Sequence, residues 1–424
     1  MTPEIKQQIE QIRRGEVPEG FKHNSVSVMP CDWNTCDFHE VATIQSGLVS
    51  PKEEPYCFMF HIGPDNIDRD TGRIGNLKTA CELGLVSGKF YFDAGSIVYS
   101  KIRPNLNKVC IPNFEGICSS DCYSIKARAG IDRDYLFNLM LSFPFYRRAV
   151  ACSMRTGMPK INQDDLNAIP VVMPSQLEEQ QKIAAILTTQ DKVIELKEKL
   201  LAEKQRQKKY LMQVLLTGKK RLPRFSGEWK VNRLRNIATR HTKRNTIGNT
   251  NALTISAQYG LINQAEFFNK AVASDDKSNY FLLEKGDFAY NKSYSNGYPF
   301  GAIKRLTRYE VGIVSPLYIC FRIKEGSVSG EYLEQYFEAG LMNHEIQAFA
   351  QEGARNHGLL NIAVDDFFNS KILLPSPEEQ TAIAEVLSAS DREIGLLRQD
   401  IEHEKQKKKA LMQLLLTGIV RVKV

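Results

Sequence analysis

The chain lacks long apolar runs and a recognisable targeting segment. No stretch approaches the roughly 18 consecutive apolar residues that a membrane-spanning helix needs. The segment Met1–Gln8 is polar and has no apolar core of the kind found in a signal peptide. We therefore expect a cytoplasmic protein without a membrane partner.

The cysteines do not form a familiar metal or disulfide framework. There are nine of them, an odd number, and none forms a C-x-x-C pair. Three residues separate Cys118 from Cys122, but no histidine lies near them to complete a zinc set. We expect reduced thiols and no metal site.

Catalytic and cofactor motifs are missing as well. The chain has no Walker A loop, no G-x-G-x-x-G fingerprint and no H-E-x-x-H. It also lacks the Asn-Pro-Pro-Tyr or Asp-Pro-Pro-Tyr motif that amino-methyltransferases carry. Glu402, Glu404 and Lys405 lie in a charged helical face, which is a poor nuclease candidate. We predict a protein that is not an enzyme by itself and holds no cofactor.

The composition is that of an ordinary globular protein with more than one domain. The chain has 424 residues, 42% of them hydrophobic and 25% charged. This length favours two or three domains. The formal charge of +7 permits a nucleic-acid partner but does not require one.

A tandem repeat is the strongest positive signal in the sequence. Between residues 180–218 and 380–418, 16 of 39 positions are identical at an offset of 200. The clearest block, L-M-Q-x-L-L-T-G, begins at Leu211 and again at Leu411. Each repeated segment follows a more variable domain of roughly 145 residues. One scaffold that carries two different specificities would produce this pattern.

The variable domains match each other only in outline. The offset between matching residues drifts from 191 to 196, which indicates loop insertions and deletions. The matched pairs include Trp33 with Trp229, Gly95 with Gly286, Tyr99 with Tyr290, Lys101 with Lys292, and Tyr123 with Tyr318. Short strands are predicted at 96–100 and 311–314, between loops rich in Gly, Asn and Pro.

Each repeated segment carries the signals of one long helix. Ser175 and Ser376 stand near the predicted starts, and two glutamates follow each of them in the first turn. Gly218 and Gly418 stand where a glycine commonly ends a helix. About 39 helical residues span roughly 58 Å. One turn of DNA spans about 34–36 Å, so a rod of this length can hold two readers about one turn apart on a duplex.

Apolar residues recur at spacings of three and four along both segments, as in a coiled coil. The predicted seam consists of Ile183, Leu187, Ile194, Leu201, Leu211, Leu215, Ile383, Leu387, Ile394, Ile401, Leu411 and Leu415. Gln190, Lys197, Lys204 and Lys208 dilute the first stripe. Each helix packing only on its own domain is one alternative. Two similar seams in one chain favour an antiparallel pair with pseudo-twofold symmetry.

Basic residues cluster near the end of each predicted helix. They are Lys204, Arg206, Lys208, Lys209, Lys405, Lys407, Lys408 and Lys409. Two interpretations stay open for them. They either approach DNA phosphates, or they are solvated charges that favour the helix C-terminus.

The ordered set of motifs resembles the specificity subunit of Type I restriction-modification enzymes over nearly the whole chain. The marks are the P-S-x(1–2)-E-E-Q starts, the L-M-Q-x-L-L-T-G ends, and the segments that begin at Gly95 and Gly286. The resemblance implies an α+β protein with two target recognition domains in tandem. Two long antiparallel coiled-coil-like helices with pseudo-twofold symmetry would separate and hold these domains.

The resemblance also implies the partners. Each domain would read half of a bipartite asymmetric site in double-stranded DNA. The helices would set the spacing and bind two methyltransferase (modification) subunits, and two restriction subunits join these in the nuclease form. The partner methyltransferase would hold S-adenosylmethionine, flip out an adenine and methylate its N6.

These expectations divide the chain into six segments. We predict an N-terminal arm over 1–30, a first recognition domain over 31–175, a central helix over 176–218, a second recognition domain with its leading linker over 219–375, a C-terminal helix over 376–418 and a tail over 419–424. The arm matches the family's core less clearly and receives no role.

Polar and basic loop residues are the candidate DNA contacts. The first group follows a predicted strand in each domain: Lys101, Arg103, Asn105, Asn107, Lys108, Lys292, Ser293, Tyr294, Ser295 and Asn296. The second group precedes each long helix: Arg155, Thr156, Lys160, Arg355, Asn356 and His357. Arg and Lys can bond guanine, and Asn can bond adenine. Solvated loops, or phosphate contacts that carry no sequence information, are the alternatives.

Three other functions differ from this one in what they require of the sequence. A methylation-only or other DNA-defence assembly would use the same scaffold, and only a neighbouring nuclease gene would separate it from the restriction system. A standalone enzyme would need a catalytic motif. A half-length subunit that acts as a homodimer is disfavoured by the complete second repeat.

Overall fold

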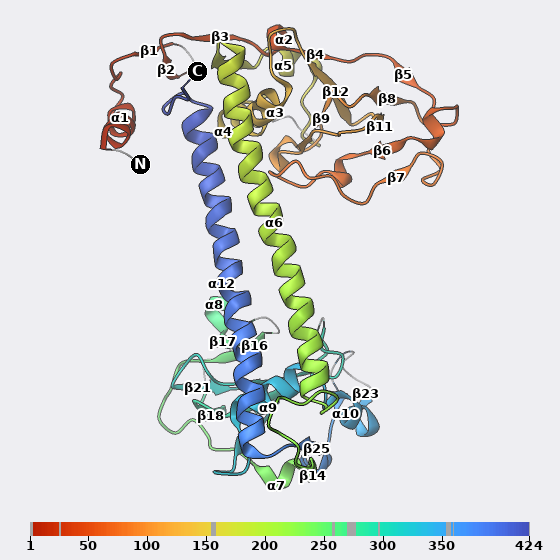
Figure 1. The fold of residues 1–424 in the computed structure, drawn as a ribbon, viewed down its shortest axis with the longest axis vertical. Helices are drawn as coiled ribbons and strands as arrows, with labels where there is room; N and C mark the ends of the chain where they lie inside the picture. The colour runs from red at the N-terminus through yellow and green to blue at the C-terminus, as the bar shows by residue number, and fades with distance from the viewer. Residues whose placement is uncertain are drawn as a thin grey trace. The chain divides into compact units, whose positions relative to one another are not determined.

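The computed structural model describes the chain except residues 1–2, 25–26, 154–157, 257–258, 269–276, 296, 353–357, 359 and 424. It forms two compact units. Unit 1 comprises Met1–Lys197 together with Asp400–Val424, and unit 2 comprises Glu198–Gln399. Both units mix helices and sheets, so the predicted α+β class is confirmed (Figure 1). No helix within the described residues is long and apolar enough to cross a bilayer.

Unit 1 contains two larger sheets. One has the strand order β10-β9-β12-β4 and the other β5-β8-β11-β6-β7. The strands of the first are β4 (Ala42–Ile44), β9 (Ile97–Ser100), β10 (Val109–Cys110) and β12 (Cys122–Ala127). Those of the second are β5 (Leu48–Val49), β6 (Phe60–Ile62), β7 (Lys78–Thr79), β8 (Lys89–Phe92) and β11 (Gly116–Cys118).

Short helices and two small strand pairs complete unit 1. The strand pairs are β1 (Phe21–His23) with β2 (Val28–Pro30), and β3 (Trp33–Asp37) with β13 (Pro170–Pro174). The helices are α1 (Pro3–Arg13), α2 (Phe38–Val41), α3 (Arg133–Leu141), α4 (Phe143–Cys152) and α5 (Gln163–Asn167). Single 3-10 turns lie at η1 (Tyr56–Phe58), η2 (Pro64–Asn66) and η3 (Pro104–Leu106).

Unit 2 repeats the order of the four-stranded sheet of unit 1 and differs in its additional strands and helices. Its main sheet has the order β15-β22-β19-β20, with β15 (Ala238–Arg240), β19 (Phe288–Asn291), β20 (Ala302–Arg305) and β22 (Ile319–Ile323). Its strand pairs are β14 (Lys230–Arg233) with β25 (Lys371–Leu374), β16 (Leu253–Ser256) with β17 (Gly260–Asn263), β18 (Phe281–Glu284) with β21 (Val311–Val314), and β23 (Gln351–Glu352) with β24 (Leu360–Asn361). Its short helices are α7 (Leu234–Ile237), α8 (Gln264–Phe268), α9 (Gly330–Glu338), α10 (Asn343–Phe349) and α11 (Val364–Asn369).

Strand register corrects one of the predicted correspondences between the units. Tyr99 of β9 pairs with Tyr123, whereas Tyr290 of β19 pairs with Ile319. Ile319, not Tyr318, is therefore the counterpart of Tyr123. The prediction was wrong by one residue because two tyrosines happen to stand near each other in the alignment. In a strand, this slip moves a side chain to the opposite face of the sheet.

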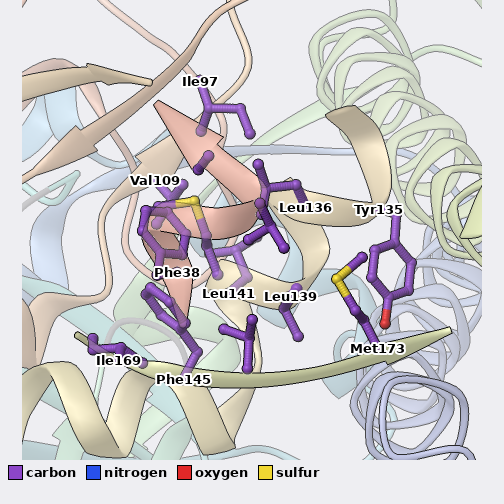
Figure 2. Close-up of a cluster of buried hydrophobic side chains, with 14 of the residues drawn as sticks. Phe38, Ile97, Val109, Tyr135, Leu136, Leu139, Leu141, Phe145, Ile169 and Met173 are labelled. Atoms are coloured by element: carbon purple, nitrogen blue, oxygen red, sulfur yellow. The ribbon is translucent and has the colours of Figure 1, made fainter. Parts of the chain in front are cut away.

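The core of unit 1 lies between the β4-β9-β12 sheet and helices α3 and α4. Figure 2 shows Phe38 and Phe145 with their rings together, at 5.4 Å between centroids. Leu136, Leu139 and Ile97 belong to the same buried cluster. Side chains of α6 and α12 extend this cluster, so each long helix is anchored in a domain core as well as in its partner helix.

The two repeated segments are single helices of 39 residues, α6 (Leu177–Leu215) and α12 (Pro377–Leu415) (Figure 1). In unit 1, Asp191 binds Lys408 at 2.6 Å and Lys197 binds Asp400 at 2.8 Å. Residue numbers rise along one helix as they fall along the other, so the helices are antiparallel.

Unit 2 contains the symmetric counterpart of this pairing. Lys208 binds Asp391 at 2.6 Å, which is the Lys408–Asp191 pair displaced by 200 positions. The same two residue types thus meet in both units with their helices exchanged. This exchange is the pseudo-twofold relationship that the repeat predicted.

Candidate nucleic-acid interface

In unit 1, the first group of candidate DNA contacts and Lys160 of the second group lie on neighbouring loops. The first loop follows β9, and the second lies between α4 and α5. The backbone N–H of Arg103 donates to Pro159 O at 2.8 Å, and that of Ile161 donates to Lys101 O at 2.9 Å. Lys101 and Arg103 therefore share one surface with Pro159 and Ile161. We call the loop after β9 and the loop before α5 the reading loops of unit 1.

Unit 2 has reading loops with the same backbone connection. The N–H of Tyr294 donates to Gly358 O at 2.7 Å, and the N–H of Leu360 donates to Lys292 O at 3.1 Å. Lys292 therefore corresponds to Lys101, and Tyr294 to Arg103. The common register shows that one scaffold presents different side chains in the two units.

Positive charge gathers on the reading loops of unit 1. Lys101 Nζ lies over the Tyr123 ring, 5.1 Å from its centroid, and Lys160 is exposed beside it. Burial lowers the pKa of Lys101, the Lys160 charge lowers it further, and Asp121 acts in the opposite direction. Two like charges held close together repel each other, so an anion such as phosphate that binds between them lowers their electrostatic free energy.

Arg103 and Asn105 are the exposed members of the first loop. Arg103 has φ of 47°, in the left-handed region that residues other than glycine seldom adopt. Its guanidinium has no hydrogen-bond or ion-pair partner in the part of the chain that the structure describes. It is therefore available to a ligand from a fixed backbone position.

Asn107 and Lys108 are turned toward the protein instead. Asn107 is 7% exposed, and its Nδ2 donates to Asp70 Oδ1 and to Leu141 O, both at 3.2 Å. Lys108 Nζ donates to Pro64 O at 2.5 Å. The sequence could not show this, because burial comes from residues far along the chain. Asn107 thus holds the loop in place through these two hydrogen bonds.

In unit 2 the described candidates are less charged. The Tyr294 side chain is 63% exposed, and Lys292 and Ser293 are half-buried. The Ser293 N–H donates to Asn291 Oδ1 at 3.1 Å, and Ser295 exchanges backbone hydrogen bonds with Tyr298. The remaining candidates lie outside the described residues: Arg155, Thr156, Asn296, Arg355, Asn356 and His357.

The predicted helix seam lies mostly in the interior. Its buried members are Ile183, Leu187, Ile194, Leu215, Ile383, Leu387, Ile394, Ile401 and Leu415, and its half-buried members are Leu201, Leu211 and Leu411. Ile183 and Leu187 pack in the core of unit 1, and Ile383 and Leu387 pack in that of unit 2. The seam thus serves domain packing at the start of each helix.

Polar residues that interrupt the apolar stripe bind the opposite helix. Glu404 accepts hydrogen bonds from Gln190 Nε2 at 2.6 Å and Lys197 Nζ at 2.8 Å. In unit 2, Lys204 binds Glu393 at 2.7 Å. Lys204, Lys208 and Lys408 form ion pairs between the helices, which neither interpretation of the basic clusters had included.

Sequence reasoning missed an ion pair between a partly exposed arginine and a buried glutamate in each unit. Arg421 binds Glu179 in unit 1, and Arg221 binds Glu379 in unit 2. Each guanidinium also lies over a tryptophan ring, Trp33 and Trp229 respectively. The signal was present, since the offset of 200 continues past the terminal glycines to these two arginines.

Comparisons with known proteins agree on one family. The Type I restriction modification DNA specificity domain model matches residues 30–205. The specificity subunit of the Type I restriction enzyme EcoDI from Escherichia coli is 40% identical over 181 residues, which are 43% of this chain and 38% of that protein. That match thus spans well under half of this relative's length. The MjaVIII specificity subunit from Methanocaldococcus jannaschii is 27% identical over 335 residues, covering 73% of this chain and 75% of that one.

Solved structures show the same fold at low sequence identity. A chain from a study of complex assembly and conformational transition in the type I R-M system has a TM-score of 0.58 and 17% identity, with 92% of this chain and 99% of that chain covered. The S subunit from M. genitalium has a TM-score of 0.53 and 11% identity, with coverage of 96% and 100%.

Proposed function

We propose that this chain is a specificity subunit of the Type I restriction-modification family and acts as the DNA-reading subunit of such a complex; the family model over residues 30–205, the 40% identity to the EcoDI subunit and the shared fold support this. It recognises a bipartite asymmetric site in double-stranded DNA. Unit 1 reads one block of that site and unit 2 reads the other. The long helices keep the gap between the blocks constant.

The repeated reading loops are the observation that carries this proposal. In both units, a strand-end loop and a pre-helix loop are joined by the same two backbone hydrogen bonds. The side chains on this common framework differ, with Arg103 in one unit and Tyr294 in the other. Two readers of one design and different chemistry suit two blocks of different sequence.

The exposed faces of the long helices suit two copies of one partner. Leu196 and Leu396 are equivalent under the 200-residue repeat, and they are 64% and 67% exposed. The repeat therefore places an exposed large apolar side chain at the same point of both helices, where two copies of one partner can each cover one. We assign these surfaces to two methyltransferase subunits, one on each.

The chemistry belongs to the partners in this proposal. The methyltransferase subunits bind S-adenosylmethionine, receive a flipped adenine and methylate its N6. Two restriction subunits join them in the nuclease form. This chain selects the sequence and holds the partners on it.

The methylome tests the proposal directly. The chain is expressed with the adenine methyltransferase subunit encoded beside it, in a host that lacks this modification. Modification-sensitive sequencing should find two short defined blocks around a fixed gap. A single continuous motif, or no motif with an active and assembled partner, would contradict the proposal.

A further inference from the structure

One position of the reading loops carries different chemistry in the two units. At the first position, both units have a lysine, Lys101 and Lys292. Two residues later, unit 1 has Arg103 and unit 2 has Tyr294. The backbone hydrogen bonds to Pro159 and Gly358 establish that these two residues are equivalent.

This contrast separates backbone contacts from base contacts. Phosphates are the same in every half-site, so a position that mainly binds phosphate is expected to keep the same cation in both units, even though neutral donors such as tyrosine hydroxyls also reach phosphates. Lys101 and Lys292 meet that requirement. Arg103 and Tyr294 do not, because an arginine fork and a single phenolic hydroxyl differ in charge, in number of donors and in shape. A position whose chemistry changes between two readers is instead suited to base edges, which change between the two blocks.

The backbone around Arg103 is well fixed for such a contact. Its N–H is bound to Pro159, and its carbonyl accepts from the Leu106 N–H at 2.9 Å. The next residue, Pro104, is buried and begins the 3-10 turn η3. A left-handed conformation costs free energy in a residue other than glycine, so the contacts around Arg103 must hold it in place. The turn therefore presents the guanidinium from a rigid base.

We propose that Arg103 and Tyr294 occupy one base-reading position that occurs in each recognition domain, and that Arg103 specifies a guanine. This inference rests on the proposed function. The Arg103 fork donates to guanine O6 and N7 in the major groove. Tyr294 makes no such bidentate contact, so its block has no arginine-read guanine at the corresponding position.

The test measures whether the contribution of one guanine N7 to the binding affinity requires Arg103. The assembled complex of this chain and its methyltransferase binds duplexes in which each guanine of the unit 1 block is replaced in turn by 7-deazaguanine. R103A removes the guanidinium. R103N is a second variant that removes it while retaining a residue tolerant of positive φ. Arg14, an exposed arginine of the N-terminal arm, gives the matched control R14A.

For the unmodified chain, 7-deazaguanine should weaken binding at one guanine of that block. R103A and R103N should weaken binding of the native site about 5- to 150-fold and abolish the sensitivity at that guanine. R14A should retain it. By contrast, K292A should weaken all duplexes alike and reduce the salt dependence.

Four results would overturn the inference. The first two are an equal loss of affinity for all duplexes in R103A and an affinity that R103A leaves unchanged. The other two are a sensitivity to 7-deazaguanine that R103A retains at every guanine and a unit 1 block that contains no guanine. If the wild-type complex modifies a bipartite motif and any of these is found, only the assignment of Arg103 fails. If the wild-type complex modifies no bipartite motif, the proposed function fails first.

Discussion

Arg421 and Glu179 are 242 positions apart and form two hydrogen bonds, of 2.6 and 2.9 Å. The Glu179 side chain is 2% exposed, whereas Arg421 reaches the surface and also binds Asp32 with two bonds of 2.8 Å. Arg221 and Glu379 form the same fork in unit 2, at 2.6 Å for both bonds. Arg421, which follows α12, therefore helps to hold the first unit together.

Replacing Arg421 by alanine should destabilise unit 1 and leave unit 2 unchanged. The substitution leaves the Glu179 carboxylate buried without its partner, which typically costs about 3–5 kcal/mol. We expect about 2–3 kcal/mol, because Arg421 is partly exposed and water can enter. Denaturant unfolding followed by tryptophan fluorescence measures it, since the chain has two tryptophans, Trp33 in unit 1 and Trp229 in unit 2.

Two controls identify the buried charge as the cause. Adding E179Q to R421A removes the unpaired charge and should restore part of the lost stability. R221A should produce the mirror effect, with the loss seen at Trp229. Equal losses in both units from R421A would contradict this account.

The two helix-terminal glycines should differ in their tolerance of alanine. Gly218 and Gly418 have φ of 69° and 72°, so alanine is strained at both, by about 1–2 kcal/mol. A Cβ at 418 would also meet Pro30 Cγ at 2.5 Å, whereas a Cβ at 218 would stand 3.4 Å from the nearest atom of Trp229. G418A should therefore destabilise unit 1 by more than G218A destabilises unit 2. Equal effects in thermal unfolding would show that the extra contact is relieved at no cost.

Stability of the helix pair in unit 1 should fall in acid. The Lys197 ammonium and the Gln190 amide lower the pKa of Glu404 from 4.5 to about 2. Because the folded pKa is depressed, this carboxylate contributes its full stabilisation above 4.5 and loses it as the pH falls toward 2. Comparing E404Q with the wild type by unfolding at pH 6 and pH 3 should show a difference that shrinks at the lower pH. A difference independent of pH would exclude this titration.

Charge on the exposed helix leucines should remove one partner subunit at a time. L196D and L396D each place a carboxylate in a surface that we assign to a methyltransferase subunit. Native mass spectrometry should show complexes with one methyltransferase instead of two for either variant, and none for the double variant. Two bound subunits in the double variant would place the docking surface elsewhere.

Local patterns predicted the long helices, because a sustained apolar stripe and terminal glycines are properties of neighbouring residues. The repeat also predicted that the two units share one design. The partners of Gln190, Lys204 and Lys208 could not be predicted, because an ion pair between antiparallel helices depends on their relative register. From the sequence alone, a polar residue within an apolar seam can either destabilise the helix pair or form a hydrogen bond or ion pair with the opposite helix.

The reading loops show the same limit. Strand ends and pre-helix loops were predicted as separate candidate surfaces, and only backbone pairing brings Arg103 to Pro159. Asn107 looked similar to Asn105 in sequence, yet contacts with Asp70 and Leu141 bury it. Tyr318 was matched to Tyr123 by residue type alone, and strand register shows that Ile319 is the counterpart.

The central claim is that each recognition domain reads one block independently. The most direct test replaces residues 229–375 with the corresponding domain of a relative of known, different specificity, and compares the methylomes of the two complexes. We predict that one block of the motif changes, while the other block and the length of the gap stay the same. A change in both blocks, or a motif unaffected by the exchange, would contradict the account.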